Sequence, residues 1–121
     1  MEATAAVFFA IAALGGVFLT TLHFRGRVLP KALALLHGAV AVGGLALLLI
    51  DIVQAAPGRA TGQEKTALIL FAVASLGGLV LFFGFHLSKK RLPSALIVIH
   101  AVIAMTAFGL LIVHLGQMKS T

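Results

Sequence analysis

The sequence LHFRGRVLPKALALLH runs from Leu22 to His37, and a similar sequence, FHLSKKRLPSALIVIH, runs from Phe85 to His100. A shift of 63 residues aligns the first histidines, His23 and His86, and also the histidines that close the two stretches. The leucine–proline pair inside each stretch aligns at the same shift. Because proline is accepted in the first turn of a helix, each stretch predicts a helix end, a short loop and a new helix.

The composition is that of a membrane protein. Of the 121 residues, 61% are hydrophobic and 10% are charged, whereas a soluble domain is about half apolar and a quarter charged. The absence of cysteine excludes disulfides and thiolate metal sites. Six of the nine Lys and Arg residues fall in the two short segments 25–31 and 88–92. This placement indicates membrane topology and argues against nucleic acid as a partner.

Apolar segments long enough to cross about 30 Å of hydrocarbon recur along the chain. The expected spans are 5–24, 30–52, 66–87 and 93–116. They predict an all-α four-helix transmembrane bundle that forms a single domain over residues 1–121. The bundle would consist of two repeated helical hairpins, at about 5–52 and 66–116. Hairpins with the same orientation would be related by a pseudo-two-fold axis along the membrane normal.

The basic residues predict the orientation of the chain. Both short loops lie on the same side of the expected bundle and carry most of the positive charge. The positive-inside rule places these loops in the cytoplasm and both termini outside. We therefore expect an integral protein of a bacterial inner membrane, with periplasmic termini and the lipid bilayer as its surroundings.

The repeated histidines are the main candidates for a functional site, because an ionisable side chain inside a membrane is costly. His37 and His100 each lie seven residues after their proline, about 10 Å into the helix. The second and fourth helices of an up-down-up-down bundle are diagonal partners. Two imidazoles facing each other across the bundle could supply both axial ligands of a haem iron. The sequence thus predicts a haem held by His37 and His100.

The other aligned histidines, His23 and His86, lie closer to the cytoplasmic helix ends and could hydrogen-bond the haem propionates. The basic residues expected to meet the propionates are Arg25, Arg27, Lys89 and Lys90. Two alternatives remain open for the histidines. They could be buried groups bonded to backbone or hydroxyl oxygens of neighbouring helices, or all four could bind one bare metal ion.

His114 lies fourteen residues after His100 on the same expected helix. With this spacing and the His37–His100 pair, the chain resembles small four-helix membrane b-type cytochromes, a class that includes superoxide oxidases and the membrane subunits of formate dehydrogenases. The resemblance implies bis-histidine haem b, quinone chemistry and electron transfer. No outer-side histidine on the first three helices can pair with His114, so one haem b is expected. A second haem at His114 would require Met118 or another copy of the chain.

Polar residues near the outer ends of the second and fourth helices form a candidate quinone site. Asp51, Gln54 and His114 could supply hydrogen bonds and a proton acceptor to a quinol. The alternative is that these residues are ordinary polar helix ends in the headgroup zone.

Functions other than that of a cytochrome also fit the composition. The chain could be an accessory subunit of a larger membrane complex, or a small metal or cation transporter that uses the histidines. Quinone, an electron-transfer partner protein or a second copy of the chain in a homodimer are the partners that such a cytochrome could have. No G-x-S-x-G, P-loop or H-E-x-x-H motif is present. If the protein is an enzyme, it is a haem-dependent membrane oxidoreductase whose cofactor carries the chemistry.

Overall fold

A computed structural model describes residues 2–55, 58 and 62–120 of the chain, with side chains described as far as Gln117. The described residues form four helices that are long and apolar enough to cross a membrane. The helices are α1 (Glu2–Phe24), α2 (Lys31–Gln54), α3 (Gly62–Leu79), which continues into the π-helix η1 (Val80–His86), and α4 (Ser94–Ser120). The fold is therefore an all-α bundle of membrane-spanning helices, as the sequence predicts.

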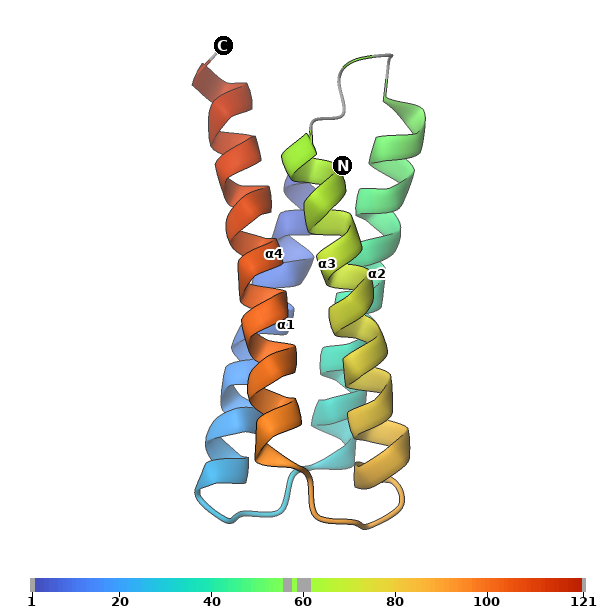
Figure 1. Cartoon of the computed structure of the whole chain (residues 1–121), viewed down its shortest axis with the longest axis vertical. Helices are drawn as coiled ribbons and strands as arrows, with labels where there is room; N and C mark the ends of the chain where they lie inside the picture. The colour runs from blue at the N-terminus through green and yellow to red at the C-terminus, as the bar shows by residue number, and fades with distance from the viewer. Residues whose placement is uncertain (1, 56–57, 59–61, 121) are drawn as a thin grey trace.

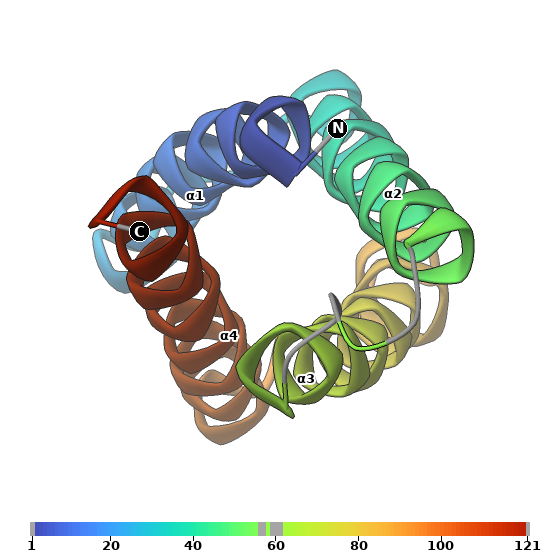
Figure 2. The same ribbon diagram turned by 90° about the horizontal axis from the view of Figure 1, so that it is seen from above.

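The helices run up and down in chain order. Figure 1 shows both short loops at one end of the bundle, with the two termini and the longer α2–α3 link at the other. Seen along its axis, the bundle is square, with α1 diagonal to α3 and α2 diagonal to α4 (Figure 2). The expected diagonal pairing of the second and fourth helices is confirmed. We refer to the end with the short loops as the loop end and to the opposite end as the terminal end.

Two of the helices begin earlier than the approximate spans, both at the terminal end. The third helix begins at Gly62 rather than at residue 66, and the first begins at Glu2 rather than at residue 5. An acidic side chain in the first turn, Glu2 in α1 and Glu64 in α3, favours these earlier starts because it complements the helix dipole. Both glutamates consequently belong to the bundle.

The short loops turn through left-handed backbone at matching places. Gly26 has a φ of 69° and Lys89 a φ of 57°. In each loop this residue donates its N–H to the carbonyl three residues earlier, His23 O for Gly26 and His86 O for Lys89. Pro30 immediately precedes the first residue of α2 and has extended backbone there. The proline-marked helix starts are therefore close to their expected positions.

The inward faces of the helices follow a spacing of alternating three and four residues. In α1 this stripe contains Ala5, Phe9, Ala12 and Leu19, all buried, with Gly16 between the last two. Such spacing is typical of left-handed bundles with knobs-into-holes packing. The stripe sets which residues of each helix meet at the centre, and it alternates small and large side chains along the axis.

The apolar core occupies the terminal half of the bundle. Phe9 of α1 and Phe71 of α3 stack across the diagonal, with ring centroids 3.6 Å apart and planes 5° from parallel. A Cβ added to Gly44 of α2 would lie 3.1 Å from the Phe9 ring. The members of this buried cluster are Ala5, Ala6, Phe9, Leu48, Ala67, Phe71, Ala107 and Leu111. The half with the short loops is instead built around histidine and glycine.

The π-helix η1 changes the register between the two hairpins. The Leu87 N–H donates to Phe82 O, a bond that closes a turn one residue wider than an α-helical turn. Before η1, residues in matching environments on α1 and α3 are 62 apart, as in Phe9 and Phe71. After η1 they are 63 apart, as in His23 and His86. A single shift of 63, which pairs Phe8 with Phe71, therefore holds only beyond η1.

Candidate functional site

His37 and His100 face each other inside the loop half of the bundle. Their side chains are half-buried, and their ring centroids lie 6.3 Å apart with planes 80° to each other. Each imidazole forms a hydrogen bond with the other helix of its own hairpin. His37 Nδ1 donates to Ala12 O at 2.7 Å, and His100 Nδ1 donates to Ala74 O at 2.8 Å. The structure thus brings together the two histidines that the sequence selects first.

These hydrogen bonds determine which ring nitrogen can bind a metal. A carbonyl oxygen only accepts, so Nδ1 of each histidine must carry the proton. Nε2 of His37 and of His100 then keeps its lone pair. Histidines that bind metals usually donate their other ring N–H to a carbonyl or carboxylate, which orients the ring. Both rings are therefore in the tautomer that metal ligation requires.

Glycines allow each imidazole to lie against the neighbouring helix. A Cβ added to Gly16 would lie 3.0 Å from Cε1 of His37, and one added to Gly78 would lie 3.2 Å from Cε1 of His100. Gly15 and Gly77 border the same rings, with the added Cβ 3.7 Å and 3.6 Å from the respective Nδ1 atoms. Any larger residue at the first two positions would push its histidine away from the carbonyl that holds it.

The spacing of the two rings fits a pair of axial ligands. With metal–nitrogen bonds of about 2.0 Å and ring nitrogens about 1.1 Å from the ring centroid, two imidazoles on opposite sides of one ion have centroids about 6 Å apart. The observed 6.3 Å agrees with this separation. The neighbouring inward residues on α1 and α3 are Ala12, Gly16, Ala74 and Gly78. Their small side chains let the two imidazoles lie at the centre of the bundle.

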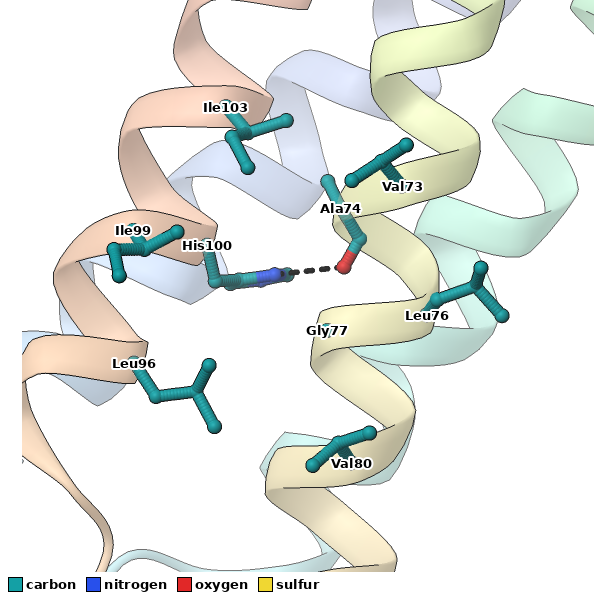
Figure 3. A pocket seen from close by; sticks show the side chains of 9 residues that line it. All are labelled: Val73, Ala74, Leu76, Gly77, Val80, Leu96, Ile99, His100 and Ile103. Atoms are coloured by element: carbon teal, nitrogen blue, oxygen red, sulfur yellow. Dashed lines mark hydrogen bonds between the residues drawn. The ribbon is translucent and has the colours of Figure 1, made fainter.

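Apolar space also borders His100. A cavity of about 280 Å³ lies between α3 and α4, and Figure 3 shows the His100 ring reaching across it toward Ala74. Leu76 and Val80, which line it, are exposed on the outer surface of the bundle, so the cavity opens toward lipid. Its walls consist of Val73, Ala74, Leu76, Gly77, Val80, Leu96, Ile99, His100 and Ile103. A hydrophobic molecule could reach the imidazole from the bilayer.

His23 and His86 connect the two hairpins at the loop end. His23 Nε2 lies 3.0 Å from Ser94 Oγ, at the start of α4. His86 Nε2 donates to Leu29 O at 3.0 Å, just before α2. Both bonds match the alternative in which the histidines bond backbone or hydroxyl groups, and the bonds of His37 and His100 to carbonyl oxygens match it as well. The basic residues expected to meet propionates, Arg25, Arg27, Lys89 and Lys90, are exposed at the same end.

A second polar cluster lies at the terminal end. His114 is 1% exposed, and its Nε2 lies 3.2 Å from Glu2 Oε2 and 3.4 Å from Glu64 Oε2. Asp51, half-buried on α2, interacts with both glutamates. Gln54, the remaining residue of the expected quinone site, is exposed. The side chain of Met118, considered as a ligand partner for His114, lies outside the described residues.

The sequence interpretation missed Glu2 and Glu64 as site residues. Both were assigned to a terminus or a link, because apolar windows end before them. Their signal lies in the inward stripe, since Glu2 lies three residues before Ala5 and Glu64 three residues before Ala67. Extending the alternating spacing by one step would have placed both glutamates at the centre of the bundle.

Comparisons with known protein families, curated proteins and solved structures find no match for this chain. What the fold defines is an all-α integral membrane protein whose helices form a four-helix bundle. Its function must be argued from the histidine pair and from the terminal cluster.

Proposed function

We propose that the protein is a membrane b-type cytochrome that holds one haem b between His37 and His100 and transfers electrons. The observation that carries this proposal is the facing pair of imidazoles, 6.3 Å apart, with each Nδ1 bonded to a backbone carbonyl. Iron in a haem takes up and releases one electron, and the protein supplies its ligands and surroundings. Quinone or a partner protein would exchange the electron.

The residues around the histidines would set the properties of this site. Ala12 O and Ala74 O fix the ring orientations through bonds that leave Nε2 as the ligand atom. Gly16 and Gly78 permit the close approach that makes these bonds possible. The apolar neighbours exclude water, which favours retention of a hydrophobic macrocycle. The exposed Arg and Lys side chains at the loop end would attract carboxylate groups on its rim.

We also propose that the two hairpins are repeats related by a pseudo-two-fold axis along the membrane normal. The contacts of His37 with Ala12 and Gly16 are matched by those of His100 with Ala74 and Gly78. Stacking of Phe9 on Phe71 is the contact expected between equivalent residues that meet on such an axis. A haem between His37 and His100 would then lie on the axis and meet equivalent surroundings on both faces.

Visible spectroscopy tests the haem proposal. The protein is expressed in bacteria supplied with a haem precursor, purified in detergent and examined by reduced-minus-oxidised spectra, with haem counted per chain. We expect a Soret band and about one haem per chain. His37→Ala and His100→Ala should each lower haem content at least tenfold, because each removes an axial ligand.

The matched control is Thr106→Ala on α4, whose hydroxyl is exposed and donates to Val102 O of its own helix. It should leave the spectrum unchanged. The proposal is wrong if well-folded wild-type protein binds no haem under these conditions. It is also wrong if both histidine variants retain the wild-type band.

A further inference from the structure

We propose that Glu2, Glu64 and His114, together with Asp51, bind one divalent transition-metal ion at the terminal end of the bundle. This site is separate from the histidine pair. His114 follows His100 by fourteen residues on α4, a distance of about 21 Å along the helix. The inference therefore does not depend on the haem proposal.

The first argument is the convergence of ligand atoms from different helices. One donor atom each from Glu2 of α1, Glu64 of α3 and His114 of α4 lie within 4.8 Å of one another. Glu64 is fully buried, His114 is 1% exposed, and the Glu2 side chain is 13% exposed. Asp51, from the remaining helix α2, interacts with both glutamates. Three of the four helices thus bring one potential ligand each to a common point, and Asp51 of the remaining helix lies beside two of these ligands.

The second argument comes from the distances. Charge-assisted hydrogen bonds between nitrogen and carboxylate oxygen are usually about 2.7–2.9 Å long. His114 Nε2 lies farther than this from its carboxylate neighbours, at 3.2 Å from Glu2 Oε2 and 3.4 Å from Glu64 Oε2. Ligand atoms bound at about 2.1 Å to one ion lie about 3.0 Å apart at right angles and about 3.4 Å apart at the tetrahedral angle. The observed separations match neighbouring positions around one ion.

The third argument is charge. The cluster combines three carboxyl groups with one imidazole, at the end of a bundle whose next inward layer contains Leu48 and Leu111, both fully buried. Several carboxylates gathered in such apolar surroundings repel one another and are costly to desolvate. A divalent cation bound between the carboxylates would balance two negative charges and remove much of their mutual repulsion.

The donor set narrows the choice of metal. Calcium and magnesium prefer ligands that are all oxygen, whereas an imidazole nitrogen with carboxylate oxygens suits Zn²⁺, Mn²⁺ or Fe²⁺. No thiolate is available, because the chain has no cysteine. Zn²⁺ is a suitable probe, since it accepts four ligands of this mixed kind and has no redox chemistry.

Metal counting on the full chain tests the proposal. The protein carries a C-terminal tag without histidines, is stripped with chelator in detergent and is then equilibrated with Zn²⁺ or Mg²⁺. Elemental mass spectrometry should find one zinc per chain and no bound magnesium. Glu64→Gln and His114→Gln, which keep the side-chain size nearly constant, should each weaken zinc binding at least tenfold. Thr106→Ala, which removes an exposed hydroxyl bonded only to its own helix, should bind zinc like the wild type.

Thermal unfolding separates loss of the site from loss of the fold. Zn²⁺ should raise the melting temperature of the wild type and of Thr106→Ala, but not that of Glu64→Gln. In chelator, Glu64→Gln should melt close to the wild type. The proposal is overturned if the wild type does not bind zinc, or if Glu64→Gln and His114→Gln both bind zinc as tightly as the wild type. Haem spectra of the same samples report separately on His37 and His100.

Discussion

Glycine determines how closely each central histidine approaches the neighbouring helix. Gly16 and Gly78 are the positions where an added Cβ would press on an imidazole, at 3.0 Å and 3.2 Å. Contacts this short force the ring to move by some tenths of an ångström. The bonds to Ala12 O and Ala74 O would lengthen with it, and the ring would lose its fixed orientation.

Gly16→Ala should therefore reduce haem binding several-fold and destabilise the protein by roughly 1 kcal/mol, because the added methyl overpacks the site. Haem per chain and the thermal midpoint in detergent measure the two effects. Gly38→Ala is the matched control, since a Cβ added there meets nothing within 4 Å. It should leave haem content unchanged. Equal haem loss in both variants would mean that the contact with His37 is unimportant.

At the residue scale, the sequence predicted the histidine pair but not the glutamates. His37 and His100 stand out because ionisable groups are rare in apolar segments and because they recur at a fixed shift. Glu2 and Glu64 lie at the ends of such segments, where charge is ordinary. Their burial depends on the residue at which α1 and α3 begin and on which face of each helix points into the bundle. Hydropathy predicts neither the first residue nor the inward face. The sequence indicated His114 and Asp51 of the terminal cluster, but not Glu2 and Glu64.

At the scale of elements, η1 is the feature that could not be predicted from the sequence. The histidines and prolines of the two stretches align at a shift of 63, whereas Phe9 and Phe71, before η1, lie 62 residues apart. The wide turn closed by Leu87 N–H and Phe82 O accommodates one extra residue without breaking the helix. The positions of α2 and α4 could be predicted because their prolines and histidines share one register. The first helix of each hairpin could not be aligned without the backbone.

Deleting Phe83 should convert η1 into a regular α-helix and leave the rest of the bundle in place. Phe83 is 59% exposed, so little packing is lost, and the deletion removes one residue from the widened turn. Gly78 and His86 would then be separated by seven residues, like Gly16 and His23 on α1. We expect monodisperse protein with a melting temperature within a few degrees of the wild type.

Deletion of Val102 provides the comparison. This residue is similarly exposed but lies in the regular helix α4 between His100 and His114. Its removal rotates one part of α4 against the other by about 100°, so the variant should misfold or aggregate. If the Phe83 deletion causes as much misfolding or aggregation as the Val102 deletion, the bundle requires the extra residue of η1.

At the scale of the whole molecule, charge is distributed unequally between the two ends. The loop end carries exposed Arg25, Arg27, Lys89 and Lys90, whereas the terminal end carries Glu2, Asp51 and Glu64. Short loops rich in Lys and Arg remain in the cytoplasm during insertion. The hairpin arrangement places both loops on the same side, so the two charge clusters favour the same orientation (Figure 1).

This orientation predicts the behaviour of reporter fusions. Alkaline phosphatase fused after the last residue of the chain should be active in bacteria, because the C-terminus would face the periplasm. Green fluorescent protein at the same position should be dark. Fusions that end within the first short loop, after Arg27, should show the opposite pattern. Bright fluorescence from the C-terminal fusion would reverse the proposed orientation.

The hairpins, the diagonal pairs and the common side of the loops could all be predicted from helix length and loop length. The difference between the two halves of the bundle could not. In one half Phe9 and Phe71 stack at the centre, and in the other half the imidazoles lie against Gly16 and Gly78. Both arrangements depend on how each helix is rotated about its axis. Apolar periodicity in a membrane helix is weak, since the lipid-facing side is also apolar.

The stacked rings of Phe9 and Phe71 have a consequence for the leakage of ions through the protein. Together with Leu48 and Leu111 they fill the axis of the bundle with hydrocarbon. A hydrated ion that followed this axis would have to shed its water among phenyl and isobutyl groups, at a cost of many kcal/mol. The bundle can therefore lie in a bilayer that carries a voltage and act as an electrical insulator along its axis.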